Sequence, residues 1–268
     1  MKFFRGFLEA KSEGQRQEIK GQEIKEQEAQ NAEVPRPELT EEQIREKLSK
    51  LGDIEELAKS VRDPFKPSSI KALARLVIKI ESDLPSYDTV LSDEASGRLP
   101  SLFLSKIINN ARLKNGQDSL QTYFITAGRY QDPEKAKAVK DFLASKKDKI
   151  GKALVVTEYI CTGAVIQGLV EAMKRLGINF DVAAVSINEE NDIIKNNHIR
   201  YGTIQSEGSL GTSGGLGFYR HFASGVIKDN TDPSPHLEAR YPYDRGDINR
   251  ARKDIDFLAK EFIDKLLS

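Results

Sequence analysis

The chain is poor in the residues that build disulfides and metal centres. Among its 268 residues are one cysteine, Cys161, and three histidines, His198, His221 and His236. A single cysteine excludes an internal disulfide and fits a reducing compartment. In the absence of targeting signals, we expect a cytoplasmic protein by default. The histidines lack the spacing of metal ligands and lie far from Cys161 in sequence, which argues against a zinc site and against a Cys/His catalytic pair.

Long apolar runs and net charge are also missing. No apolar run approaches the roughly 20 residues that a membrane-spanning helix needs. The N-terminus has no sustained apolar stretch of the kind that a signal peptide carries. Lys plus Arg and Asp plus Glu both number 41, so no overall field draws the chain to nucleic acid or to an anionic membrane. We therefore expect neither of these partners.

Residues 1–38 differ in composition from the rest of the chain. They are rich in Gln, Glu and Lys and poor in apolar residues. Such a segment cannot bury a face, and we expect a charged, disordered tail that is helical at intervals. The alternative is a helix that binds a protein partner through its few apolar side chains, which are Phe3, Phe4, Phe7 and Leu8. The folded domain is then predicted to span residues 39–268.

Helical and extended patterns alternate along this domain. Helices are predicted at 40–51, 54–61, 70–82 (capped by Ser68 or Ser69), 99–111, 132–147, 165–176 and 248–267. Strands are predicted at 87–92, 121–126, 153–156, 181–187 and within 198–205. This alternation predicts an α/β fold with a parallel, doubly wound sheet and helices on both faces.

The stretch 152–177 carries the strongest functional signal. Its apolar run at 153–156 is short and β-branched, as expected of a strand buried on both faces. A loop of small and polar residues is predicted at 157–163, followed by a helix with Gly177 as its C-cap. The N–H groups of such a loop and helix start can bind a phosphate. Glu158, at the end of the strand, lies where open α/β sheets bind ligands.

The segment VVTEYICTGAVIQGL, at 155–169, resembles the PRPP-binding signature of type I phosphoribosyltransferases. That signature is an apolar strand, two acidic residues and a Thr/Gly-rich loop that enters a helix. By order of elements the resemblance covers about 85–190, the predicted core. It implies a divergent member of this family, whose core carries N-terminal helices and a C-terminal hood.

The resemblance implies a site for PRPP or a related ribose phosphate, with Mg²⁺ (magnesium) as cofactor. The ribose 5-phosphate would be bound by Thr157, Glu158, Tyr159, Cys161, Thr162, Gly163, Ala164 and Val165. Glu158 would bind the ribose hydroxyls and stabilise the positive charge that develops on the ring during transfer. Arg129 is the other catalytic candidate, since it is placed to reach the site from the preceding interval. We also consider that the chain forms a homodimer.

The segment SDEASGRLP, at 92–100, takes the place of the family's pyrophosphate loop. A polar turn is predicted here, in which Ala95, Ser96, Gly97 and Arg98 would meet the pyrophosphate, with Arg98 supplying charge. Acids repel pyrophosphate unless a metal intervenes, so Asp93 and Glu94 are the predicted metal ligands. The alternative is that these acids only end a strand and that Arg98 is a surface residue.

The signature departs from the family's pattern. Thr157 replaces the first acid, and Cys161, Ala164 and Val165 replace residues that are usually Thr, Gly and Thr or Ser. A predicted helix takes the place of the flexible catalytic loop that many members carry before the signature strand. The Gly/Ser segment 206–217 is either a connector or a lid over the site.

Two functions follow from these residues. The protein transfers a phosphoribosyl group from PRPP to an unidentified base or amine with release of pyrophosphate, or it is a catalytically inactive module that binds a nucleotide and regulates a partner. Thr157 and the missing loop favour the second, whereas Glu158 and the Thr162–Gly163 turn favour binding under both. An unrelated doubly wound hydrolase is a third interpretation, but the chain has no G-x-S-x-G elbow.

Overall fold

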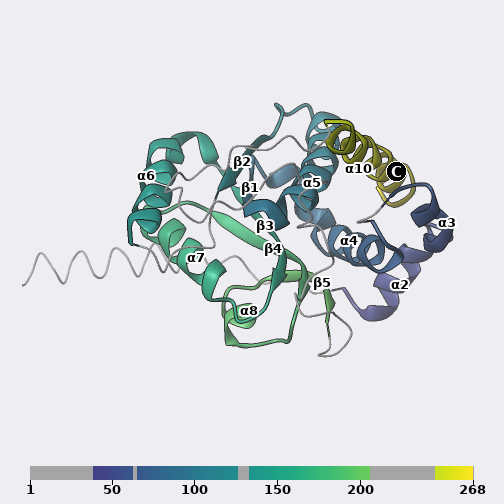
Figure 1. The fold of residues 1–268 in the computed structure, drawn as a ribbon, viewed down its shortest axis with the longest axis horizontal. Helices are drawn as coiled ribbons and strands as arrows, with labels where there is room; N and C mark the ends of the chain where they lie inside the picture. Colours follow the sequence, from purple (N-terminus) through teal and green to yellow (C-terminus); the bar gives the residue numbers. More distant parts are fainter. Residues whose placement is uncertain (1–38, 63–64, 126–132, 206–244, 268) are drawn as a thin grey trace, which may run out of the picture. The chain divides into compact units, whose positions relative to one another are not determined.

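The centre of the fold is a sheet of five parallel strands within the part of the chain that the structure describes (Figure 1). The structure is a computed structural model, and it describes residues 39–62, 65–125, 133–205 and 245–267. The strands lie in the order β2-β1-β3-β4-β5. Their bounds are β1 (Thr89–Asp93), β2 (Gln121–Ile125), β3 (Ala153–Ile160), β4 (Phe180–Ile187) and β5 (Arg200–Ile204).

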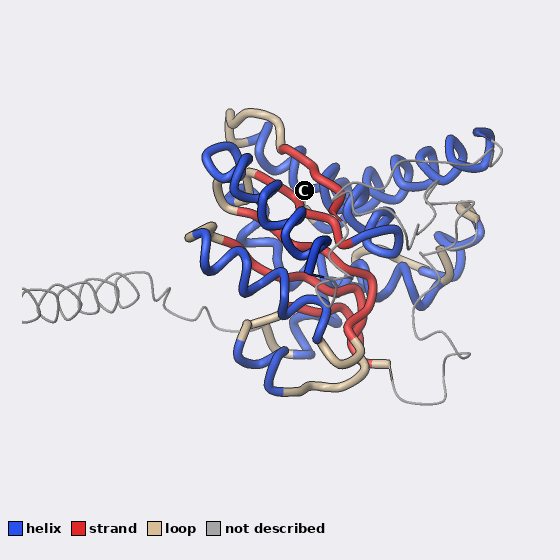
Figure 2. Tube along the Cα trace, turned by 60° about the vertical axis from the view of Figure 1, so that its left-hand side comes forward, coloured by secondary structure: helices blue, strands red, loops and turns tan. Residues whose placement is uncertain are grey.

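Helices cover both faces of this sheet (Figure 2). One face carries α4 (Pro67–Ile80), the 3-10 helix η1 (Glu81–Ser86), α5 (Glu94–Lys114) and α10 (Arg245–Leu266), with α2 (Glu41–Ser49) and α3 (Ile54–Lys59) packed on α4. The other face carries α6 (Pro133–Ile150), α7 (Ala164–Leu176) and α8 (Asp192–Asn196). The predicted α/β class, with a parallel sheet flanked by helices, is confirmed.

The alternation of side chains along β3 divides the apolar core in two. Leu154 and Val156 belong to the cluster under α4, α5 and α10, whereas Ala153 and Val155 belong to the cluster under α6 and α7. All four are fully buried, as expected of a central strand in a parallel sheet. No helix among the described residues is long and apolar enough to cross a membrane.

Local sequence signals placed several helix ends correctly. Thr40 and Gln43 form a reciprocal capping box at the start of α2. Gly177 ends α7 in the left-handed conformation, with a φ of +64°. The predicted cap of α4 is wrong: the helix begins at Pro67 after Lys66, before Ser68 and Ser69, because proline at the first helical position sacrifices no hydrogen bond.

Other predicted bounds are wrong because tertiary contacts extend the elements. β3 continues to Ile160, so Thr157, Glu158 and Tyr159 belong to the strand and not to the predicted loop. Pairing with the equally long β4 supports this extension, up to Ile160 opposite Ile187. The predicted polar turn at 93–98 is also wrong, since α5 begins at Glu94. The helix α10 begins earlier than predicted, at Arg245, and α8 was not predicted.

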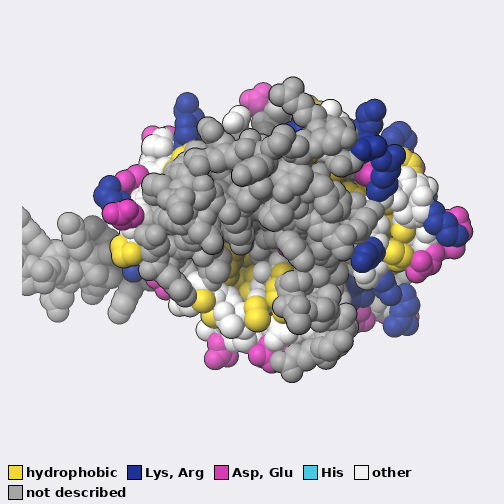
Figure 3. All heavy atoms as spheres, viewed as in Figure 1, with side chains coloured by type: hydrophobic (Ala, Val, Ile, Leu, Met, Phe, Trp, Pro, Cys, Tyr) yellow, Lys and Arg dark blue, Asp and Glu magenta, His cyan; other side chains and the backbone are white. Residues whose placement is uncertain are grey.

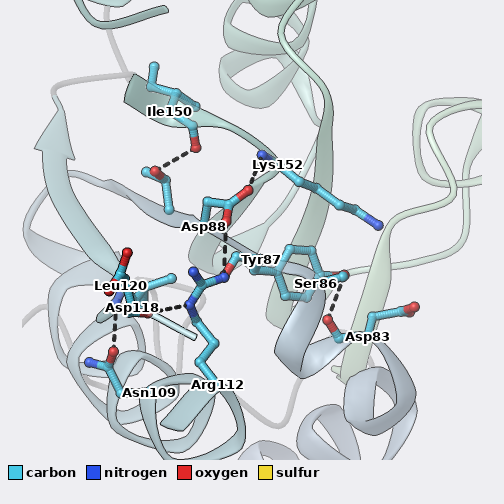
Figure 4. Close-up of polar contacts among 11 residues, drawn as sticks. Asp83, Ser86, Tyr87, Asp88, Asn109, Arg112, Asp118, Leu120, Ile150 and Lys152 are labelled. Atoms are coloured by element: carbon cyan, nitrogen blue, oxygen red, sulfur yellow. Dashed lines mark hydrogen bonds and ion pairs between the residues drawn. The ribbon is translucent and has the colours of Figure 1, made fainter. Parts of the chain in front are cut away.

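A polar network ties together the amino-terminal edge of the sheet (Figure 4). Arg112 of α5 donates through Nη1 to Tyr87 O at 2.7 Å and to Asp88 Oδ1 at 3.0 Å, and through Nε to Asp118 O at 2.8 Å. The other carboxylate oxygen of Asp88 accepts from the backbone N–H of Lys152 at 2.9 Å. The network therefore links α5 to the segments that lead into β1 and β3.

The same edge holds a buried tyrosine. The hydroxyl of Tyr87 donates to Asp181 Oδ2 at 2.8 Å, and Lys152 Nζ lies 3.1 Å from the same oxygen. Burial, together with the nearby Asp181 carboxylate, raises the pKa of Tyr87 above its ordinary value. Tyr87 is therefore a neutral hydrogen-bond donor in this network.

We expect Arg112→Ala to lower the free energy of unfolding by about 2–4 kcal/mol, because it leaves the buried carbonyl of Tyr87 and the Asp88 carboxylate without their cationic donor. Urea unfolding at neutral pH measures the change. Arg175→Ala is the control, since Arg175 makes only an exposed pair with Glu171 on α7, and its loss should stay below about 0.5 kcal/mol. Equal losses in the two variants would contradict a structural role for the network.

Candidate functional site

The carboxyl ends of β1 and β3 form the candidate site. These strands are neighbours in the sheet, yet the chain leaves β1 for α5 on one face and leaves β3 for α7 on the other. Connections that diverge from neighbouring parallel strands mark the position at the carboxyl edge where open α/β sheets bind ligands.

The first turns of α5 rest directly on the backbone of β3. A Cβ atom at Gly97 would lie 2.8 Å from Val156 O, 3.2 Å from Ser92 Oγ and 3.5 Å from Thr157 Cα. Only glycine permits this approach without displacement of the helix. The contact brings the predicted pyrophosphate segment beside the predicted ribose segment, although they are far apart in sequence.

The backbone alone is described for the residues before Gly97. Asp93 is the last residue of β1, and Glu94, Ala95 and Ser96 lie at the start of α5. Their side chains lie outside the description. The N–H groups at the start of a helix have no partners within it and carry partial positive charge. The start of α5 therefore offers anion-binding groups at the carboxyl edge of β1.

The short turn between β3 and α7 supplies a second helix start. Gly163 is the N-cap of α7 and has a φ of +82°, and a Cβ there would also lie 2.9 Å from Cγ2 of Ile193. Thr162 Oγ1 accepts from the N–H of Ala164 at 3.4 Å. Cys161 and Thr162 are exposed, and Val165, whose side chain is not described, is the second residue of α7. The turn before α7 is therefore exposed at the carboxyl edge of β3.

Glu158 and Thr157 are both buried at the end of β3, 1% and 2% exposed. Successive side chains of a strand face opposite sides, so Glu158 lies on the same side as Val156, toward α5. Thr157 and Tyr159 lie on the side of α7, where the Tyr159 hydroxyl donates to Asn188 Oδ1 at 3.3 Å. Glu158 therefore lies on the face of the sheet that carries α5, and Thr157 lies on the opposite face.

Arg98 occupies the carboxyl edge of the sheet next to this group. Its guanidinium lies over the ring of Phe124, with Cζ 4.1 Å from the ring centroid. Phe124 pairs in register with Ser92, at the ends of β2 and β1. Partial burial lowers the pKa of Arg98, and the like charge of Arg252 lowers it further. Arg98 is therefore a half-buried cation at the edge and not a fully exposed surface residue.

Several predicted features lie outside the described residues. They are Arg129, the segment 206–217, His221 and His236. The tail at 1–38, with its proposed partner helix, also lies outside them. Among the residues that are described, no three metal-ligating side chains gather in a cluster.

Two buried polar side chains at the carboxyl edge were not singled out in the sequence. Ser92 Oγ, at the end of β1, and both amide atoms of Gln205, which follows β5, are buried without a hydrogen-bond partner. A polar residue directly after an apolar run, as in Val90-Leu91-Ser92, is a signal that could have identified the first of them.

No family model matches the chain, and no curated protein matches it as a relative.

We expect Gly97→Ala to lower the free energy of unfolding by about 1–3 kcal/mol, because the added methyl group collides with the carbonyl oxygen of Val156. Ser92→Ala removes a buried, unpartnered hydroxyl and should raise that free energy by about 1 kcal/mol, so the double variant is compared with Ser92→Ala. Urea unfolding of both single variants and the double variant measures the effects. Full recovery of stability in the double variant would place the collision at Ser92 and would contradict the contact with β3.

Proposed function

We propose that this protein binds PRPP and transfers its phosphoribosyl group to a base or an amine. The observation that carries the proposal is the contact of Gly97 with β3. It holds the first turns of α5 against the end of β3, the strand that carries the buried Glu158, and α7 begins at Ala164 after the turn that follows β3. A ligand with an anionic group at each end and hydroxyl groups between them matches this order of groups.

The proposed reaction exchanges one bond at ribose C1 for another. The bond to the pyrophosphate oxygen breaks, a bond to the acceptor nitrogen forms, and pyrophosphate and a proton are released. Positive charge develops on the ribosyl ring during this exchange, as in glycoside hydrolysis. The carboxylate of Glu158 would stabilise that charge and accept hydrogen bonds from the ribose hydroxyls. Thr162, Gly163 and the start of α7 would bind the 5-phosphate.

The proposal includes a magnesium ion that is held mainly by the ligand. Mg²⁺ commonly takes one or two protein carboxylates and completes its shell with water and substrate phosphates. Glu158 can supply one such carboxylate, and Asp93 and Glu94 remain the proposed further ligands. When bound, the ion would neutralise charge on the departing pyrophosphate.

A second candidate function is a catalytically inactive module that binds the same ligand and regulates a partner. Thr157 favours it, because this residue stands where the resembling family has its first acid. The two functions share the site and differ in turnover. Release of pyrophosphate in the presence of PRPP, Mg²⁺ and a panel of nucleobases and amines supports the transferase. Tight binding without release for any acceptor supports the regulatory module.

We expect wild-type protein to bind PRPP with Mg²⁺ in isothermal titration, and Glu158→Gln to bind at least about tenfold more weakly, because the charged acceptor for the ribose hydroxyls is lost at nearly constant volume. Glu56→Gln is the control, since Glu56 is an exposed residue of α3 paired with Lys59, and its affinity should match that of wild type. Failure of folded wild-type protein to bind PRPP would remove the proposal. Unchanged affinity in Glu158→Gln would remove the role of Glu158.

A further inference from the structure

The short helix α8 packs against the turn from which α7 begins. A Cβ atom at Gly163 would lie 2.9 Å from Cγ2, 3.0 Å from Cδ1 and 3.3 Å from Cβ of Ile193. Ile193 is partly buried in the apolar cluster that includes α7, and hydrophobic side chains are visible at the surface in this part of the molecule (Figure 3). The side chain of Ile193 therefore fills the space beside Gly163 that a larger residue there would occupy.

Other contacts hold α8 in place. Its N-cap, Asn191, accepts through Oδ1 from the N–H of Ile194 at 3.1 Å. The side chain of Ile194 is 3% exposed and belongs to the core on the α7 face of the sheet. At the other end of α8, Asn197 Oδ1 accepts from Nζ of Lys174, in the last turn of α7, at 3.0 Å. Because α8 is fixed at both ends and through its core residue, it is a firm support for Ile193.

The turn itself has a backbone that is easily disordered. Cys161 and Thr162 are exposed, and Gly163 has a φ of +82°, in a region that glycine enters and leaves freely. The hydrogen bond from the N–H of Ala164 to Thr162 Oγ1 is long, at 3.4 Å. A glycine-centred turn of this kind loses much conformational entropy when it is ordered. Packing of Ile193 against the turn reduces the number of conformations available to it.

We propose that Ile193 is a positioning residue, which holds the turn before α7 in the conformation that binds the 5-phosphate. The inference rests on the proposed function, which assigns this phosphate to Thr162, Gly163 and the start of α7. Backbone N–H groups bind a phosphate best when they already converge on one point, because the cost of ordering them is then not deducted from the affinity. Ile193 acts through the backbone of Gly163, so its effect should be confined to the phosphate end of the ligand.

The test compares Ile193→Ala with Ile193→Val by isothermal titration with ribose 5-phosphate, PRPP and inorganic pyrophosphate, each with Mg²⁺. Alanine removes both Cγ2 and Cδ1, whereas valine keeps Cγ2, the atom nearest to the Cβ position of Gly163. We expect Ile193→Ala to weaken binding of ribose 5-phosphate and PRPP about threefold to tenfold and to change that of pyrophosphate by less than about twofold. Ile193→Val should stay within about twofold of wild type for all three ligands.

The control for a general loss of stability is Ile54→Ala. Ile54 is also a partly buried isoleucine of a short helix, but it begins α3 and packs against the core on the opposite face of the sheet. Urea unfolding gives the stability of each variant, and we expect both alanine variants to be folded and destabilised. Only Ile193→Ala should lose affinity, and only for the two ligands that carry the 5-phosphate.

The outcomes separate this inference from the proposed function. Wild-type protein that binds PRPP, with the same affinity in Ile193→Ala, would overturn the role of Ile193 and leave the proposed function standing. Equal losses for pyrophosphate and for ribose 5-phosphate in Ile193→Ala, or equal losses in Ile54→Ala, would show a general effect of destabilisation and would also overturn it. Wild-type protein that binds neither PRPP nor ribose 5-phosphate would overturn the inference and the proposed function together.

Discussion

The contact between Gly97 and the backbone of β3 is the constraint on which the candidate site depends. A methyl group at this position would lie 2.8 Å from Val156 O, so nothing larger than glycine fits without displacement of the helix. The contact fixes where α5 begins relative to β3, and hence where its unpaired N–H groups lie relative to Glu158. The α7 start depends in the same way on Gly163, whose φ of +82° turns the chain directly from strand into helix.

The two edges of the sheet differ in how their polar groups are satisfied. At the amino edge, Arg112, Asp88 and Tyr87 hold one another and the adjacent backbone in hydrogen bonds of 2.7–3.0 Å. At the carboxyl edge, Ser92 Oγ and the amide of Gln205 are buried without partners. Hydrogen-bonded polar groups such as those at the amino edge stabilise a fold. Buried polar groups without partners lower its stability, and they are expected at sites where a protein binds a ligand. The hydrogen-bonded network and the candidate site thus lie at opposite edges of the sheet.

The extension of β3 changes the meaning of the departures from the resembling family. In a loop, Thr157 and Glu158 could both turn toward one ligand. In a strand they face opposite sides, so the missing acid at 157 alters the side of α7 and leaves the carboxylate toward α5 in place. Under the proposed function, loss of that acid therefore leaves the carboxylate of Glu158 in place.

Local signals in the sequence determined the class of the fold, the succession of helices and strands, and the positions of Thr40 and Gly177 at helix ends, because caps and hydrophobic periodicity act between residues that are close in sequence. Only the tertiary structure decided where β3 ends, since its last residues are held by β4. It alone also decided that Gly97 meets Val156. This contact joins residues that are far apart along the chain, and it arises from the packing of α5 on the sheet, for which a single sequence carries no local signal.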